Sequence, residues 1–98
     1  MHTIPQTRVT HFALGDVCMT PGARSALLRN GVNLIGLLAR HAHSDWGDVD
    51  ADDAQANRDA VLHGGRILSV YAVGGTDRLY VITEADRSLT TILLPSEY

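Results

Sequence analysis

Residues 65–95 limit the fold of this chain more than any other stretch. They hold three runs rich in Val, Ile, Leu, Tyr and Thr, at 66–73, 78–83 and 88–94. β-branched and aromatic residues favour strands, and the short gaps contain the Gly, Asp and Thr residues typical of tight turns. The stretch therefore predicts an antiparallel three-stranded meander over residues 66–94.

The two turns predict a register for this meander. A type II′ turn at Gly75-Thr76 pairs Gly74 with Asp77 and Tyr71 with Tyr80, and a second turn centred on Ala85-Asp86 places Tyr80 opposite Thr91. Because side chains alternate along a strand, one face becomes the predicted core. That face carries Leu68, Val70, Ala72, Leu79, Val81, Ile92 and Leu94. The other face carries Ser69, Tyr71, Tyr80 and Thr91 among apolar residues, and a slip of one residue in the last turn would exchange Thr90 and Thr91.

The first two thirds of the chain predict helices. Helices are expected over residues 21–29, 34–41 and 51–62, with Thr20, Asn33 and Asp50 as their N-caps. Residues 7–14 have a strand-like composition and are expected to add a fourth strand, while residues 1–6 form a loose start. Together these patterns predict one α+β domain over residues 1–98, in which an antiparallel sheet of three or four strands has two or three short helices packed on one face.

The amino-acid composition excludes several classes of function. Eight basic and eleven acidic side chains give a net charge of −3, which argues against a broad phosphate-binding surface. The single cysteine, Cys18, excludes a disulfide within the chain and zinc sites built on cysteine pairs. No apolar run is long enough to cross a bilayer. We therefore expect a cytoplasmic protein that has no membrane segment and no cofactor.

A first function hypothesis is a metal-independent endoribonuclease. The loop after the second helix is expected to deliver His41 to the hydroxyl-bearing face of the sheet as general acid or base. Arg66 would stabilise the negative charge on the phosphorane, and Ser69, Tyr71 and Thr91 would position the phosphate. The alternative for these hydroxyls is cross-strand packing on a half-exposed sheet face.

Further polar residues are predicted to contribute to binding. They are Trp46, Arg78, Tyr80, Glu84 and Arg87. His41 and His43 lie near Asp45 and Asp48, but their spacing matches no zinc signature, so no metal site is predicted and a solvated loop anchored by a buried Trp46 is preferred. Residues 83–88 are expected to form a turn, across which Glu84 and Arg87 are candidates for an ion pair.

Three segments carry a resemblance: RHAHSDWGD at 40–48, GGRILSVY at 64–71 and ITEADRSLTTILLPSEY at 82–98. They look like a family of small bacterial proteins encoded on plasmids and integrated mobile elements. That resemblance implies a mobile-element setting and no mechanism. The predicted order of strand, helical layer and meander is also similar to that of RelE-like ribonuclease toxins.

The second function hypothesis is a non-catalytic interaction protein. Tyr71 and Tyr80 on a partly apolar sheet face would anchor a host or phage protein, for example as an inhibitor of a host defence system. Homodimerisation through the same face is a further expectation. The partners to be distinguished are thus RNA and a protein.

Overall fold

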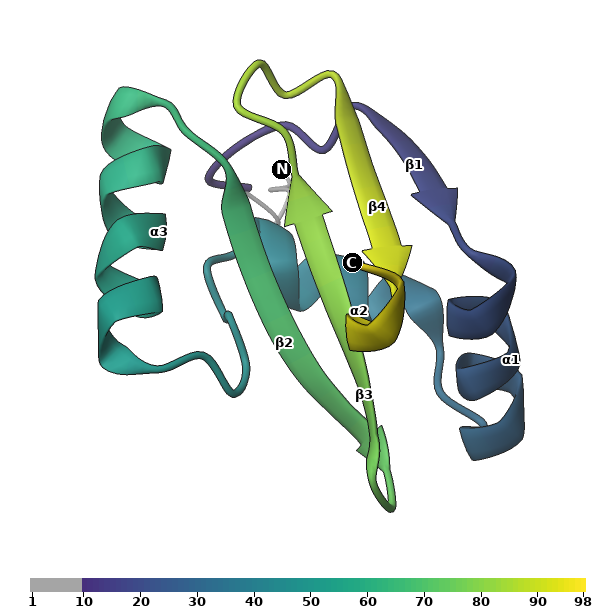
Figure 1. Ribbon diagram of the computed structural model, residues 1–98. Helices are drawn as coiled ribbons and strands as arrows, with labels where there is room; N and C mark the ends of the chain where they lie inside the picture. The colour runs from purple at the N-terminus through teal and green to yellow at the C-terminus, as the bar shows by residue number, and fades with distance from the viewer. Residues whose placement is uncertain (1–9) are drawn as a thin grey trace, which may run out of the picture.

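A computed structural model describes residues 10–98, which form an α+β domain with a four-stranded mixed sheet (Figure 1). The strands are β1 (Asp16–Met19), β2 (Ile67–Gly74), β3 (Asp77–Thr83) and β4 (Leu89–Leu93). The spatial order is β1-β4-β3-β2, in which the β2-β3-β4 meander is antiparallel and β1 runs parallel to β4 at one edge. The α+β class and the meander are confirmed, whereas the expectation of a purely antiparallel sheet is wrong.

Three helices connect β1 to the meander, and each begins at the predicted residue. They are α1 (Pro21–Asn30), α2 (Leu34–Ala42) and α3 (Ala51–His63). The side chains of Thr20, Asn33 and Asp50 accept hydrogen bonds from the backbone N–H groups of Ala23, Ile35 and Asp53. These bonds satisfy N–H groups that the first helical turn leaves without partners.

The added edge strand lies later in the chain than predicted. Residues 10–14 are irregular, and β1 begins at Asp16, where a turn was expected. The remaining part of the predicted strand, residues 7–9, and the predicted loose start, residues 1–6, lie outside the described residues. Gly15 shows why the segment before β1 changes direction, because its φ of 66° suits glycine and a Cβ there would overlap the Arg87 and Ser88 backbone.

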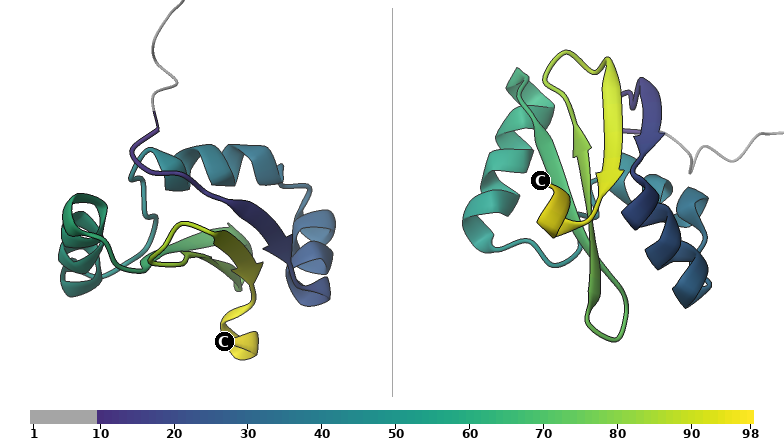
Figure 2. Two further views of the ribbon diagram at one scale, coloured as in Figure 1. Left: turned by 90° about the horizontal axis from the view of Figure 1, so that it is seen from above. Right: turned by 45° about the vertical axis from the view of Figure 1, so that its right-hand side comes forward.

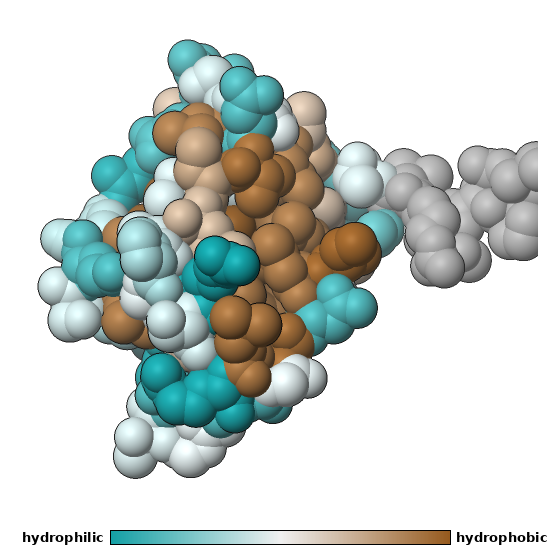
Figure 3. Space-filling view, turned by 90° about the vertical axis from the view of Figure 1, so that its right-hand side faces the viewer, coloured by the Kyte–Doolittle hydropathy of each residue, from teal (hydrophilic) through white to brown (hydrophobic). Residues whose placement is uncertain are grey.

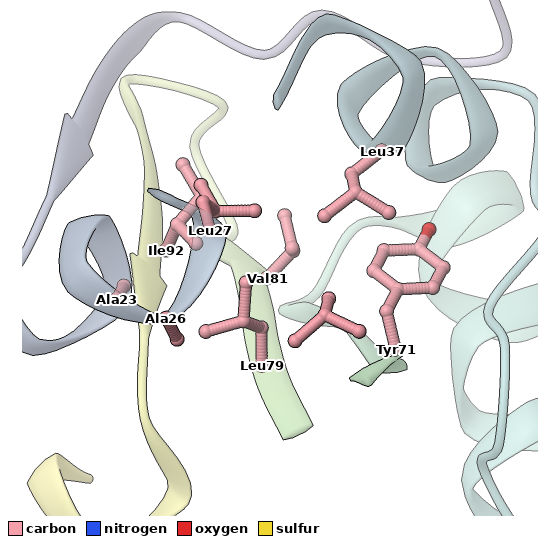
Figure 4. Packing of buried hydrophobic residues seen from close by; sticks show 9 residues of the cluster. Ala23, Ala26, Leu27, Leu37, Tyr71, Leu79, Val81 and Ile92 are labelled. Carbon is pink, nitrogen blue, oxygen red and sulfur yellow. The ribbon is translucent and has the colours of Figure 1, made fainter. Parts of the chain in front are cut away.

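The helices are distributed unevenly around the sheet. α1 and α2 contribute Ala23, Ala26, Leu27 and Leu37 to a core built against Tyr71, Leu79, Val81 and Ile92 (Figure 4). α3 lies alongside β2, where Trp46, Ala60 and Ile67 form a second apolar cluster. On the opposite side of the sheet, the short 3-10 helix η1 (Pro95–Glu97) is the only helix among residues 10–98 (Figure 2).

The register of β2 against β3 differs from the prediction by one residue. Gly74 does pair with Asp77, but a bulge between Ala72 and Gly74 shifts the rest of the strand, so that Tyr71 pairs with Leu79 instead of Tyr80. A shift of one residue turns every preceding side chain to the other face. The predicted core face is therefore wrong along β2, where Ile67, Ser69, Tyr71 and Val73 are the buried residues.

The register of β3 against β4 also differs, by two residues. Tyr80 pairs with Leu93 and Ile82 with Thr91. A shift of two residues keeps each side chain on its face, so Thr91 stays with Tyr80. Thr90, and not Thr91, therefore lies on the same face as Ser69 and Tyr71. A slip in the last turn would have had the same result, but the cause here is the bulge in the first hairpin.

Candidate functional site

The predicted catalytic histidine lies inside the protein, within a chain of hydrogen bonds. His41 is in the last turn of α2, and its Nδ1 lies 2.6 Å from the Ser69 hydroxyl of β2. Its Nε2 lies 2.9 Å from Oγ1 of Thr83 on β3, and that oxygen lies 2.7 Å from Oγ1 of Thr90 on β4. Thr90 donates in turn to the Leu14 carbonyl at 2.7 Å. All four side chains are fully buried.

The last hydrogen bond of this series, from Thr90 to the Leu14 carbonyl, determines the direction of every other bond in the series. A hydroxyl has one hydrogen, and Thr90 uses its hydrogen on the Leu14 carbonyl, so Thr90 must accept from Thr83. Thr83 then has no hydrogen left and must accept from His41, which places the imidazole proton on Nε2. Nδ1 is the acceptor that remains, and Ser69 donates to it. With the imidazole neutral, both ring nitrogens and all three hydroxyl groups have a hydrogen-bond partner.

The surroundings of His41 also favour its neutral form. Burial, and secondarily the positive charge of Arg87, lower the pKa of His41 to about 4. Phe12 packs edge-on against the imidazole at a centroid distance of 5.2 Å, and Trp46 does so at 6.1 Å. The neutral imidazole is closed off from solvent and connects α2 directly to β2 and β3.

Tyr71 is the second predicted catalytic residue that the structure places beside α2. Its hydroxyl donates to the Asp45 carbonyl at 2.6 Å, and the Arg40 guanidinium lies 4.5 Å from the centre of its ring. Burial raises the pKa of Tyr71 to about 12. Arg40 is held in turn by an ion pair with Asp45 at 2.7 Å. Tyr71 therefore stays protonated and positions the loop after α2.

The other two predicted catalytic residues lie on the opposite side of the sheet. Thr91 is half-buried there, and Arg66 is exposed with its guanidinium 5.3 Å from the centre of the Tyr98 ring. Tyr98 meets Tyr80 edge-on at 5.8 Å. The structure thus brings His41, Ser69 and Tyr71 together and separates them from Arg66 and Thr91 by the thickness of the sheet.

We call this second side of the sheet the open face. Its side chains are half-buried or exposed apart from Ile82 and Leu93, which are buried. The open face consists of Arg66, Leu68, Val70, Ala72, Arg78, Tyr80, Ile82, Thr91, Leu93 and Tyr98. Tyr98 is 65% exposed although it stacks against two other residues, so its ring remains available to a partner.

The remaining predicted binding residues have structural partners. Trp46 is buried, as expected for the anchor of a polar loop, and Arg78 pairs with Asp48 at 2.8 Å. Arg87 donates to the carbonyls of Gly65, Glu84 and Ala60, so it joins the β3-β4 turn to the end of α3. The expected Glu84–Arg87 contact is thus made through the Glu84 backbone, and no side-chain ion pair joins them within residues 10–98.

Sequence reasoning assigned no site role to three residues that matter here: Thr83, Thr90 and Asn57. Asn57 of α3 is buried and pairs with the edge of β2, donating to the Leu68 carbonyl at 2.7 Å and accepting from the Leu68 N–H at 3.0 Å. Its position on an otherwise alanine-rich helix face was the available signal. Thr83 carried no signal beyond strand propensity, and for Thr90 the signal was the slip that would exchange it with Thr91.

Among residues 10–98, no three side chains of His, Cys, Asp or Glu converge closely enough to hold a metal ion. No helix in the same part of the chain has the length and apolar character to cross a bilayer.

A shallow groove of about 330 Å³ lies beside the end of β1, lined by Met19, Thr20, Pro21, Arg24, Ser25 and Leu28. Its lining does not include the buried histidine.

Comparison of the chain with protein-family models, curated protein sequences and solved structures found no match.

Proposed function

We propose that this protein is a non-catalytic interaction module that binds a protein partner through the open face of its sheet. The observation that carries the proposal is the one-sided cover of the sheet. α1 and α2 pack on one face (Figure 2). The open face presents Tyr80, Tyr98 and Arg66 beside half-buried aliphatic side chains.

The composition of the open face suits a protein interface. Tyr and Arg dominate the residues that contribute most binding energy in protein complexes, and they act best on a background of apolar contacts. Tyr98 and Arg66 supply the aromatic and cationic groups, and Leu68 and Val70 supply the apolar background. The resemblance to mobile-element proteins makes a host or phage protein the partner class to test first.

The ribonuclease hypothesis needs His41 to reach a phosphate. His41 is instead 0% exposed, its two ring nitrogens are both occupied, and burial keeps its pKa near 4. A general base must lie within hydrogen-bond reach of the proton that it abstracts. These observations favour binding over catalysis as the proposal.

The test compares variants of the open face with a matched control. Immobilised wild-type protein, Tyr98→Ala, Arg66→Ala and Leu62→Ala are exposed to bacterial lysate, and a captured partner is then purified and titrated. Leu62 is the control because it is 75% exposed on α3, away from the open face. The expected result is one stoichiometric partner whose affinity falls by about tenfold or more in the two open-face variants and is unchanged in Leu62→Ala.

Two outcomes would overturn this proposal. One is a partner whose affinity does not respond to either open-face variant. The other is salt-dependent binding of single-stranded RNA that the same variants remove, since stacking on exposed tyrosines also binds bases. Catalysis is tested separately by expressing wild type and His41→Ala in a bacterium and sequencing RNA ends, where new 5′-hydroxyl ends lost in the variant would restore the ribonuclease hypothesis.

A further inference from the structure

The two edges of the sheet differ in whether their backbone groups are hydrogen-bonded to other segments of residues 10–98. At the β2 edge, Asn57 pairs with both backbone groups of Leu68, the Trp46 carbonyl accepts from the Val70 N–H at 2.9 Å, and the Val70 carbonyl accepts from the Asp48 N–H at 2.7 Å. This edge is therefore closed to further strands. No segment of residues 10–98 pairs with the outer edge of β1.

The outer edge of β1 offers four backbone groups. Asp16 donates to the Ser88 carbonyl and Thr20 to the Ile92 carbonyl, so the even-numbered residues of β1 direct their backbone groups toward β4. Because these directions alternate along a strand, the N–H and C=O groups of Val17 and Met19 point outward. Gly15 in a left-handed conformation and Pro21, which has no N–H, end the usable edge on either side.

We propose that the β1 edge is a homodimer interface, in which β1 of a second copy pairs antiparallel about a two-fold axis at Cys18. This register pairs Val17 of each copy with Met19 of the other and satisfies all four outward groups on both chains. A register centred on Val17 or on Met19 would place Gly15 or Pro21 opposite the remaining group and satisfy only half of them. The edge is thus complementary to itself in one register.

Side chains beside the edge fit the same arrangement. Val17 pairs with Thr90 and Met19 with Ile92, so both side chains lie on the helix-covered side of the sheet, where Met19 also lines the groove with Leu28. In the proposed register, Val17 of the second copy lies opposite Met19 and enters that groove. Val17 is 42% exposed and Leu28 is 72% exposed, and apolar surface forms a continuous band over this side of the molecule (Figure 3). α1 begins beyond the end of β1, so no helix within residues 10–98 runs along this edge (Figure 1).

The charges near the edge are compatible with pairing. The two Asp16 carboxylates lie at opposite ends of the strand pair, about 13 Å apart at roughly 3.3 Å per residue, where salt screens them. Each faces Thr20 of the other copy, whose hydroxyl donates to the Glu97 carboxylate.

Cys18 provides a natural probe of the register. Residues at the centre of a non-hydrogen-bonded antiparallel pair have Cα atoms about 4.5 Å apart, which lies within the range for a disulfide. Cys18 is exposed and is the single cysteine of the chain. Diamide oxidises two such thiols to one disulfide, taking up the two electrons and two protons that the thiols lose. A rapidly formed, disulfide-linked dimer is therefore expected on treatment of the full chain.

The experiment uses wild type, Val17→Lys and Leu62→Lys, which add the same charge at two exposed apolar positions. Sedimentation equilibrium should show a dimer for wild type and Leu62→Lys, with association weakened by about tenfold or more in Val17→Lys, because lysine on an edge strand opposes pairing. Cross-linking by diamide should follow the same order, and circular dichroism should show all three folded.

A wild type that remains monomeric at about 100 µM, a concentration well above the dissociation constants of specific complexes, would overturn the proposal. So would a dimer that persists unchanged in Val17→Lys, or one in which Cys18 does not cross-link. The Val17→Lys substitution lies on the helix-covered side of β1 and changes no residue of the open face. The dimer proposal and the partner-binding proposal can therefore fail independently of each other.

Discussion

The His41 imidazole and the Ser69 hydroxyl lie 2.6 Å apart inside the core, with neither side chain exposed. They are the start of a hydrogen-bonded chain that passes through Thr83 and Thr90 and ends on the Leu14 carbonyl. Buried polar groups of this kind stabilise a fold only when each has a partner, and they then restrict how the layers can pack. This series of hydrogen bonds connects α2, the three meander strands and the segment before β1.

Stability should depend on pH through His41. Between about pH 6.5, the usual histidine value, and about pH 4, the unfolded chain binds a proton that the folded chain excludes, so the free energy of unfolding falls as the pH is lowered through this window. The full loss is about 3 kcal/mol and is complete near pH 4. Urea denaturation at pH 7.5 and pH 5 measures the part of this loss that occurs above pH 5, about 2 kcal/mol. His41→Gln should flatten the dependence, whereas His63→Gln, an exposed site on α3, should retain it. Equal slopes in wild type and His41→Gln would contradict the assignment.

The tautomer of His41 should be the one that carries its proton on Nε2. The reason is the single hydrogen of Thr90, which is used on the Leu14 carbonyl and so sets the direction of the bonds through Thr83 to the ring. Long-range ¹H–¹⁵N correlation spectra of the imidazole at pH 7 distinguish the two tautomers directly. Observation of the tautomer with its proton on Nδ1 would show that the hydrogen bonds of this series have the opposite direction.

Two neighbouring threonines should respond differently to the same substitution. Thr90→Val removes the donor to Leu14 and the acceptor for Thr83 in a buried position, which should destabilise the protein by about 2 kcal/mol. Thr91→Val changes a half-buried side chain on the open face and should alter stability by less than about 0.5 kcal/mol. Thermal and urea unfolding of both variants gives the comparison. A loss of equal size in Thr91→Val would mean that the buried network has no special weight.

Asn57 should protect the β2 edge. In Asn57→Ala the Leu68 N–H and C=O lose their partners, so a destabilisation of about 2 kcal/mol and faster hydrogen exchange at the Leu68 amide are expected. Gln55→Ala on the same helix is the control, because Gln55 is exposed and its side chain bonds to Arg58 and Asp59 of the same helix. Unchanged exchange at Leu68 in Asn57→Ala would show that the edge is protected by other contacts.

The helix positions and the meander were determined by the sequence itself. The caps at Thr20, Asn33 and Asp50 act within a few residues, and the Gly75-Thr76 turn forms between adjacent strands, so local composition was sufficient to predict them. The placement of His41 near Ser69 and Tyr71 was also anticipated from the order of the elements. The burial of these three residues was not.

Only the tertiary structure decided which side of the meander faces the helices and where the fourth strand lies. The close packing of α1 on the first hairpin accompanies the first decision: Gly74 approaches Asn30 so closely that a Cβ would overlap its side chain, and the adjacent bulge turns Ser69 and Tyr71 inward. Those polar side chains are acceptable in the core because His41 and the Asp45 carbonyl, from distant parts of the chain, complete their hydrogen bonds. The parallel pairing of β1 with β4 likewise depends on contacts some 70 residues apart, between Asp16 and Leu89 onward, which no local pattern can encode.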